Sequence, residues 1–240
     1  MNVIVTGVSK GLGLEVARTL LNQGYNVYGI SRSKTDALEQ LLNEFPQSIH
    51  WVSFDLSDAE SIRDIVFKQF IGLKTPIHGL VNNAAIAYDD IATNADLNAL
   101  EAMYKVNVYS PIILSKYAIR QMLLHNIAGS LVHLSSISVH TGYKGLSMYA
   151  STKGALEAYS KNISREWGSK GIRSNCVVAG FMETEMSSAL TDEQKAKIYR
   201  RTSLKKEVSI QSVADTIDFL LSDKSESITG QNIFIDNGTI

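Results

Sequence analysis

Seven short apolar runs alternate along the chain with longer stretches of helical periodicity. Such alternation is typical of parallel strands joined by crossover helices. Several runs are almost continuously apolar, which predicts a sheet that helices cover on both faces. The sequence therefore predicts an α/β fold with a mostly parallel, seven-stranded central sheet, with strands at residues 3–5, 26–30, 50–54, 79–81, 130–134, 174–178 and 232–235.

Two helix ends are indicated by local signals. Residues 57–60 read Ser-Asp-Ala-Glu, a capping box that predicts a helix beginning at Ser57. Gly24 predicts a left-handed stop for the helix that follows the first strand. We expect that first helix to expose Arg18 and to bury Leu12, Val16, Leu20 and Leu21.

Charge and cysteine content exclude several classes of protein. The net charge of -1 over 240 residues gives no field that would gather nucleic acid or anionic lipid. No apolar run approaches the ~20 residues of a membrane-spanning helix. Cys176 is the single cysteine, and the first strand begins too close to Met1 for a secretory leader. We therefore expect a cytoplasmic protein with no nucleic-acid or membrane partner.

Length alone allows one or two domains. The chain has no internal repeat, low-complexity tract or flexible linker, so we expect one domain over residues 1–240. Segment 181–207 is polar, rich in lysine and arginine, and interrupts the rhythm of the strands. It predicts an insertion that covers a site.

A glycine-rich turn, Thr-Gly-Val-Ser-Lys-Gly-Leu-Gly at residues 6–13, joins the first strand to the first helix. Glycines let the backbone approach a pyrophosphate closely, and the free N–H groups at a helix start favour its negative charge. The position of the turn favours a dinucleotide site. The alternative is a tight turn that binds nothing.

The end of the second strand indicates which dinucleotide fits. An acidic residue there would bind both ribose hydroxyls of NAD, but residues 31–34 read Ser-Arg-Ser-Lys. Arg32 and Lys10 can pair with a 2′-phosphate, and Ser31 can donate a further hydrogen bond. NADP(H) is therefore favoured over NAD(H), unless these cations and Lys34 are only solvated surface groups. Asp55 is placed to accept from an adenine amino group, or it favours a helix dipole.

Tyr149 and Lys153 are four residues apart at the head of a helical stretch, so they share one face. A lysine ammonium close to a phenol lowers its pKa from about 10 and makes it an acid-base group. Lys153 would supply that charge to Tyr149. Such a pair taken alone is more often part of an amphipathic surface.

In combination, these motifs resemble the short-chain dehydrogenase/reductase family over essentially the whole chain. The resemblance is carried by residues 6–13, Asp55, Asn-Asn-Ala-Ala at 82–85, Asn107, Ser136 thirteen positions before Tyr149, the Tyr-Ala-Ser-Thr-Lys run at 149–153 and the tail at 229–238. Within the family the chain looks like the single-domain branch that includes 3-oxoacyl-[acyl-carrier-protein] reductases. The resemblance implies a doubly wound, Rossmann-type three-layer fold and a homotetramer or homodimer.

The resemblance also implies roles for individual residues. Tyr149 would exchange the proton of the carbonyl oxygen, Ser136 would hydrogen-bond the same oxygen, and Lys153 would lower the tyrosine pKa and bind the nicotinamide ribose. Asn107 would hold a water in a proton relay, and Thr184 would fix the carboxamide. No residue is assigned to a metal. The residues expected to bind the cofactor are Gly7, Ser9, Lys10, Gly11, Leu12, Gly13, Ser31, Arg32, Asp55, Leu56, Asn83, Ala84, Ala85, Tyr149, Lys153, Gly180 and Thr184.

Three positions depart from the family pattern. Ala85 replaces a common glycine, Ala179 replaces a proline before Gly180, and the tail 236–238 varies a double glycine. Without the proline, we expect a less fixed backbone path from Gly180 to Thr184.

The expected activity is NADPH-dependent reduction of a ketone, with a 3-oxoacyl thioester as the best substrate class by resemblance. A small-molecule or carrier-bound carbonyl compound would be the partner. The basic residues of 195–206 would steer an acidic carrier protein, unless they form a solvated helix face. The alternatives are an NADP-dependent alcohol or sugar dehydrogenase, and a dinucleotide-binding regulator without turnover. The intact Ser-Tyr-Lys-Asn set argues against the regulator.

Overall fold

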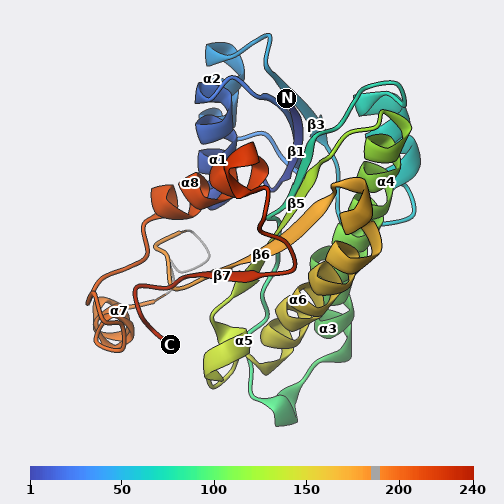
Figure 1. The fold of residues 1–240 in the computed structure, drawn as a ribbon. Coiled ribbons are helices and arrows are strands. Elements are labelled where there is room, and N and C mark those ends of the chain that lie inside the picture. Colours follow the sequence, from blue (N-terminus) through green and yellow to red (C-terminus); the bar gives the residue numbers. More distant parts are fainter. Residues whose placement is uncertain (185–189) are drawn as a thin grey trace.

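The computed structural model describes residues 1–184 and 190–240, and its centre is one seven-stranded sheet (Figure 1). The strand order is β3-β2-β1-β4-β5-β6-β7, and every neighbouring pair is parallel. The predicted doubly wound α/β sheet is confirmed, and each predicted strand is present. The strands are β1 (Asn2–Thr6), β2 (Asn26–Ser31), β3 (Ile49–Ser53), β4 (Gly79–Asn82), β5 (Ser130–Ser136), β6 (Arg173–Ala179) and β7 (Asn232–Ile235).

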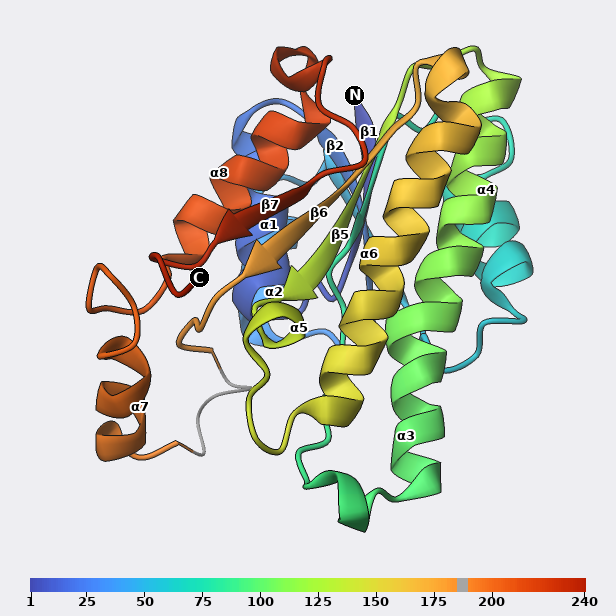
Figure 2. The same ribbon diagram turned by 60° about the horizontal axis from the view of Figure 1, so that its bottom comes forward.

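Helices form a layer on each side of the sheet (Figures 1 and 2). One face carries α1 (Gly11–Asn22), α2 (Asp36–Glu44) and α8 (Ile210–Leu221), and the other carries the widened helix Ile62–Ile71, α4 (Ser110–Leu124) and α6 (Ser147–Trp167). Two hydrophobic cores result, one between each layer and the sheet. The other helices in the described part of the chain are α3 (Leu97–Tyr104), the widened turn Lys105–Tyr109, α5 (Ser138–Thr141), α7 (Asp192–Tyr199) and the short turns Ala92–Asn94, Gly168–Lys170 and Asp223–Ser225.

The helix predicted to begin at Ser57 begins instead at Ile62, so that prediction was wrong. The Asp55 carboxylate accepts the Ser57 N–H at 2.8 Å and closes a turn of its own. Asp58 accepts the N–H of Ser61, three residues later, at 3.2 Å, which is the spacing of an N-cap hydrogen bond. Asp55 therefore takes the Ser57 N–H that the Glu60 side chain would have bound in the capping box.

For the first helix, the predicted left-handed stop and the predicted buried face are confirmed. Leu12, Val16, Leu20 and Leu21 are buried, and Gly24 has a φ of +80°. Arg18 is only partly exposed, because its guanidinium pairs with Glu44 of α2 at 2.8 Å.

The order of the strands reverses beside β1, whose neighbours are β2 and β4. Open α/β sheets bind ligands beyond the carboxyl ends of strands at such a point. The glycine-rich turn follows β1 here, and the Asn-Asn-Ala-Ala segment follows β4.

Segment 181–207 was predicted to cover the site, and its residues 185–189 lie outside the described part of the chain. Its described part contains α7, which lies apart from the sheet in Figure 2. Among the described residues, no helix is both long and apolar enough to pass through a membrane.

β5 places a histidine inside the sheet. His133 is fully buried, its Nδ1 lies 3.1 Å from Asn82 Nδ2, and its ring meets the Tyr159 ring edge-on at 5.9 Å. Burial, and then the charge of Lys153, lowers the pKa of His133 to about 4. The imidazole is therefore neutral at physiological pH.

We expect His133 to make the fold sensitive to acid. In the unfolded chain its pKa returns to 6.5, so between pH 6.5 and about 4 the unfolded chain binds the additional proton. The free energy of unfolding therefore falls as the pH falls through this window, by up to about 3 kcal/mol. Urea unfolding across this range should show less pH dependence in His133→Asn than in the wild type.

The control is His50→Asn, because His50 is exposed and stacks on Tyr28 at the edge of the sheet. It should keep the wild-type pH dependence. An unchanged acid dependence in His133→Asn would show that other groups cause it.

Candidate active site

A cleft of about 570 Å³ lies along the carboxyl ends of the central strands. All the residues that the sequence assigns to a cofactor line it, with the exception of Gly180. Gly180 packs against the C-terminal segment instead, where an added Cβ would lie 2.8 Å from Asp236 Cα. Of the four residues predicted to be catalytic, Tyr149 and Lys153 line the cleft, whereas Ser136 and Asn107 do not.

The glycine-rich turn forms one end of the cleft, and its backbone requires glycine. Gly7 has a φ of +77°, and its N–H donates to Ile30 O at 2.7 Å. A Cβ on Gly13 would lie 2.1 Å from the oxygen of Gly7 and 2.5 Å from Asn83 Nδ2. The first turn of α1 is thus packed against the turn before it, and a larger residue would push the two apart.

The segment after β4 is joined directly to the end of β1. Thr6 Oγ1 accepts the N–H groups of Asn83 and Ala84, each at 3.0 Å. The amide of Asn83 donates back to Thr6 O at 2.9 Å. These three bonds fix residues 83–84 beside the glycine-rich turn, and both segments line the cleft.

The departures from the family pattern are accommodated locally. Only Asn126, Lys205 and Asn237 among the described non-glycine residues have positive φ, so Ala85 does not need the conformational freedom of glycine. Ala179 pairs with Ile235 in the sheet. The sheet therefore fixes the backbone that the missing proline would have restricted, and Gly180 N–H continues the pairing to Ile235 O at 2.9 Å.

Arg32 is exposed in the cleft wall, on the turn after β2 that adjoins the glycine-rich turn. The Ser57 backbone N–H is the main cause that holds the pKa of Asp55 below its ordinary value, and the Arg32 charge adds to the effect. Lys34 is directed away to Glu39, at 2.8 Å. Ser31 was expected to donate to a phosphate, but its hydroxyl is buried and donates to Ser33 O at 3.0 Å.

Tyr149 and Lys153 lie on the face of α6 that lines the cleft, as their spacing predicted. Lys153 Nζ is 5.7 Å from the centroid of the Tyr149 ring and donates to Leu134 O at 2.8 Å. Burial lowers the pKa of Lys153 to about 8.

The pKa of Tyr149 is raised to about 12, chiefly by burial and then by the charge of Asp89. The expectation that Lys153 lowers it is therefore not met in the chain by itself. The ammonium is hydrogen-bonded to Leu134 O, and removal of the phenolate from water outweighs its attraction. The phenol is protonated at neutral pH and can act as a proton donor.

Asn107 lies in the widened turn Lys105–Tyr109, between α3 and α4. Such turns interrupt a helix and are frequent at functional sites. The buried amide accepts the Ile86 N–H and donates to Ile86 O, both at 2.9 Å, and it also donates to Thr152 Oγ1 at 3.1 Å. Asn107 thus ties α6 to a residue of the cleft wall, and its role in holding a water stays a prediction.

Ser136 ends β5, and its Oγ accepts from the N–H of Ser138 at 3.2 Å and from the Ser138 hydroxyl at 2.9 Å. The neighbouring Ser135 lines the cleft and donates to Glu157 Oε1. His140 of α5 contacts the same oxygen at 3.1 Å.

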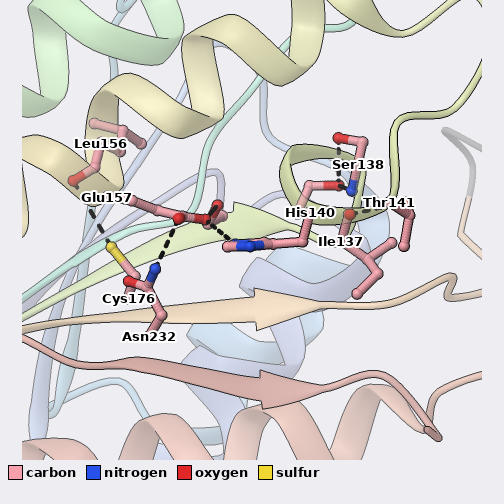
Figure 3. Close-up of polar contacts among 10 residues, drawn as sticks. Ile137, Ser138, His140, Thr141, Leu156, Glu157, Cys176 and Asn232 are labelled. Carbon is pink, nitrogen blue, oxygen red and sulfur yellow. Dashed lines mark hydrogen bonds and ion pairs between the residues drawn. The ribbon is translucent and has the colours of Figure 1, made fainter. Parts of the chain in front are cut away.

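Figure 3 shows the Glu157 carboxylate between His140 and Asn232, whose amide donates to it at 2.7 Å. The carboxylate joins α6 to β5, α5 and β7, and so braces the chain on both sides of Ser136. Sequence reasoning missed Glu157, although it lies four residues after Lys153. The missed residues of the cleft wall are mostly apolar and carry no chemical signal, such as Ile86, Ala102, Val106, Leu134 and Met182.

Comparisons with known proteins agree with this geometry. A family model described as "Enoyl-(Acyl carrier protein) reductase" matches residues 7–239. The chain is 34% identical to L-xylulose reductase of Bos taurus, over 98% of this chain and 94% of that protein. It is 32% identical to carbonyl reductase [NADPH] 2 of Sus scrofa, over 99% and 96% of the two chains. A 3-oxoacyl-[acyl-carrier-protein] reductase of Chlamydia pneumoniae is 30% identical, over 98% and 95%.

Solved structures show the same fold. A "short chain dehydrogenase/reductase family protein" superposes with a TM-score of 0.88 at 27% identity, over 99% of this chain and 96% of that one. The structure "ElxO with NADP Bound" has a TM-score of 0.89 at 28% identity, over 99% and 98%. The match to the family model over nearly the whole length, together with these relatives, shows that the chain belongs to the short-chain dehydrogenase/reductase family of oxidoreductases.

Proposed function

We propose that this protein is an NADPH-dependent reductase that passes hydride to a ketone, with Tyr149 as the proton donor. The observation that carries the proposal is a protonated tyrosine, beside a buried lysine, in a cleft that also contains the glycine-rich turn. The charge of Arg32 and the absence of an acid at residues 31–34 support the phosphorylated cofactor. A relative named for NADPH and a neighbour with bound NADP support the same choice.

The residues present fit such a cofactor. Gly11 has a φ of +55°, and a Cβ there would meet nothing closer than Thr184 at 3.8 Å, so a pyrophosphate can approach the backbone of the turn closely at this residue. Ser9, Lys10 and Gly11 line the cleft at the start of α1, and Arg32 would bind a 2′-phosphate there. Asp55 would accept from the adenine, and Thr184 and Lys153 would hold the nicotinamide end.

The protein's own contribution to the reaction is position and a proton. A bound nicotinamide would supply the hydride. Tyr149 Oη would donate its proton to the carbonyl oxygen, and Ser136 would hydrogen-bond the same atom. Lys153 would stabilise the phenolate that results, because a charged lysine favours the deprotonated tyrosine. Asn107 would hold α6, which carries Tyr149 and Lys153, against the cleft wall through its hydrogen bonds to Thr152 and Ile86.

For the substrate we propose a 3-oxoacyl thioester first. The description of the family model and the chlamydial relative support this class. The basic residues of segment 181–207 add little to it, because several of them have partners within the chain. Lys195 pairs with Glu183 at 3.2 Å, Lys197 pairs with Glu193 at 2.9 Å, and Arg201 lies over the ring of Tyr143.

A small ketose or ketone is the second candidate substrate. The reverse of its reduction would be dehydrogenation of the corresponding sugar or alcohol. The relative with 34% identity is named L-xylulose reductase, which favours this class.

The decisive experiment measures NADPH oxidation with 3-oxoacyl thioesters, keto-sugars, simple ketones and quinones, and repeats each assay with NADH. Tight NADPH binding without turnover on any class would contradict the proposal and favour a regulator.

We also propose a cytoplasmic, single-domain protein that assembles as a homotetramer or homodimer. Large apolar side chains exposed on α3, at the start of α4 and on the last strand support assembly, namely Leu97, Tyr109 and Phe234. Light scattering coupled to size-exclusion chromatography measures the state directly, and a monomer at assay concentrations would contradict this part.

The first prediction concerns the proton donor. Tyr149→Phe should lower kcat by about 10²–10⁴-fold, because only the donated proton is lost. NADPH affinity, measured by calorimetry, should change by less than about twofold. Tyr28→Phe is the control, because Tyr28 packs against His50 and Phe70 away from the cleft. Near-normal turnover in Tyr149→Phe would refute the mechanism.

The second prediction concerns the 2′-phosphate. Arg32→Asp should weaken NADPH binding by about tenfold or more relative to NADH, because a charge-assisted bond is replaced by repulsion. Lys34→Asp makes the same change of charge outside the cleft wall and should leave the ratio near its wild-type value. An unchanged ratio in Arg32→Asp would mean that Arg32 is only a surface charge.

A further inference from the structure

Two side chains of β3 donate hydrogen bonds to the turn that carries Arg32. Trp51 Nε1 donates to Ser31 Oγ at 2.8 Å, and Ser53 Oγ donates to Arg32 O at 2.8 Å. Trp51 and Ser53 are two residues apart on one strand, so they project from the same face. β3 is the outermost strand, beside β2 (Figure 1), and its last residue, Ser53, pairs with Ser31 at the start of the turn.

The bond from Trp51 also determines what Ser31 can do. Ser31 is buried and accepts the indole N–H while its own hydroxyl donates to Ser33 O at 3.0 Å. A hydroxyl has one proton, and here the turn itself uses it. Ser31 therefore connects Trp51 to the backbone just after Arg32, rather than facing the cleft as a donor.

A third bond joins this turn to the glycine-rich turn. Thr35 caps α2 by accepting the Leu38 N–H at 3.3 Å, and its hydroxyl donates to Ser9 O. Lys10 follows Ser9, so the two cations of the cleft end lie on backbone segments that are fixed relative to each other. The anchors of the Arg32 turn, from Trp51 and Ser53, complete this arrangement.

We propose that Trp51, acting through Ser31, is a positioning residue that sets the preference of this site for a 2′-phosphate, and that Ser53 assists it. The inference rests on the proposed NADPH site. Trp51 does not line the cleft, and its hydrogen bond to Ser31 joins it to a residue of the cleft wall. Its effect on the ligand is therefore indirect: it orders the backbone from which the long Arg32 side chain extends. Preorganised groups lose less freedom on binding, so the bond to phosphate strengthens.

Adenosine 2′,5′-bisphosphate and adenosine 5′-monophosphate are the probes, because they differ only in the 2′-phosphate and need no substrate. Calorimetry with the full chain should show Trp51→Phe binding the bisphosphate about threefold to tenfold more weakly, the loss expected for one hydrogen bond. Binding of the monophosphate should stay within about twofold. Ser53→Ala should act in the same direction, and Trp167→Phe, on the distant end of α6, should change neither affinity.

A double-mutant cycle tests whether the effect passes through Ser31. If Trp51 acts through that hydroxyl, Trp51→Phe combined with Ser31→Ala should weaken bisphosphate binding no more than Ser31→Ala alone. Additive losses would show that Trp51 and Ser31 act independently, and they would overturn the inference. Equal losses for both probes would also overturn it, because a general loss of structure affects both.

Arg32→Gln separates the inference from the function on which it rests. If Arg32→Gln removes the preference for the bisphosphate and Trp51→Phe with Ser53→Ala leaves it intact, the positioning role is wrong and the proposed site stands. If the wild type has no preference and Arg32→Gln changes nothing, the proposed NADPH site fails, and the inference fails with it.

Discussion

The hydrogen bonds between Thr6 and residues 83–84 are the constraint on which the site depends. β1 and β4 are distant in sequence, yet they are neighbours where the strand order reverses. Because one threonine hydroxyl accepts two backbone N–H groups, the segments that follow these strands are fixed relative to each other. Both segments line the cleft, and Gly13 packs against both only because it has no side chain.

Burial has a second effect, on the chemistry of α6. It lowers the pKa of Lys153 to about 8 and raises the pKa of Tyr149 to about 12. Both shifts favour neutral groups, as desolvation requires. A neutral phenol is suited to give a proton, which matches the direction of reduction. A cofactor phosphate and ribose would add charges and hydroxyls that the chain alone does not contain.

Much of the site was predictable because its signals are local. Glycines that need an unusual φ, a tyrosine and lysine at helical spacing, and a missing acid after the second strand can all be found in short windows of sequence. The helix start at Ser57 was wrong because Asp55 takes the Ser57 N–H that the capping box needs, and Asp58 accepts the Ser61 N–H just before the helix begins. Ser31 was assigned to the ligand because its partner Trp51 lies twenty positions away, on another strand. Glu157 was missed because its three partners come from separate elements (Figure 3).

The sequence by itself determined the seven strands, the parallel sheet and the residues of the glycine-rich turn and of the Tyr-Lys pair. These features follow from hydrophobic periodicity and from the backbone freedom of individual glycines. Both can be read from short stretches of sequence. Only the tertiary structure decided which hydroxyls are already occupied, which carboxylate braces Ser136, and the direction in which the pKa of Tyr149 moves. Hydrogen-bond partners and desolvation depend on groups brought together from distant segments, and no local pattern contains them.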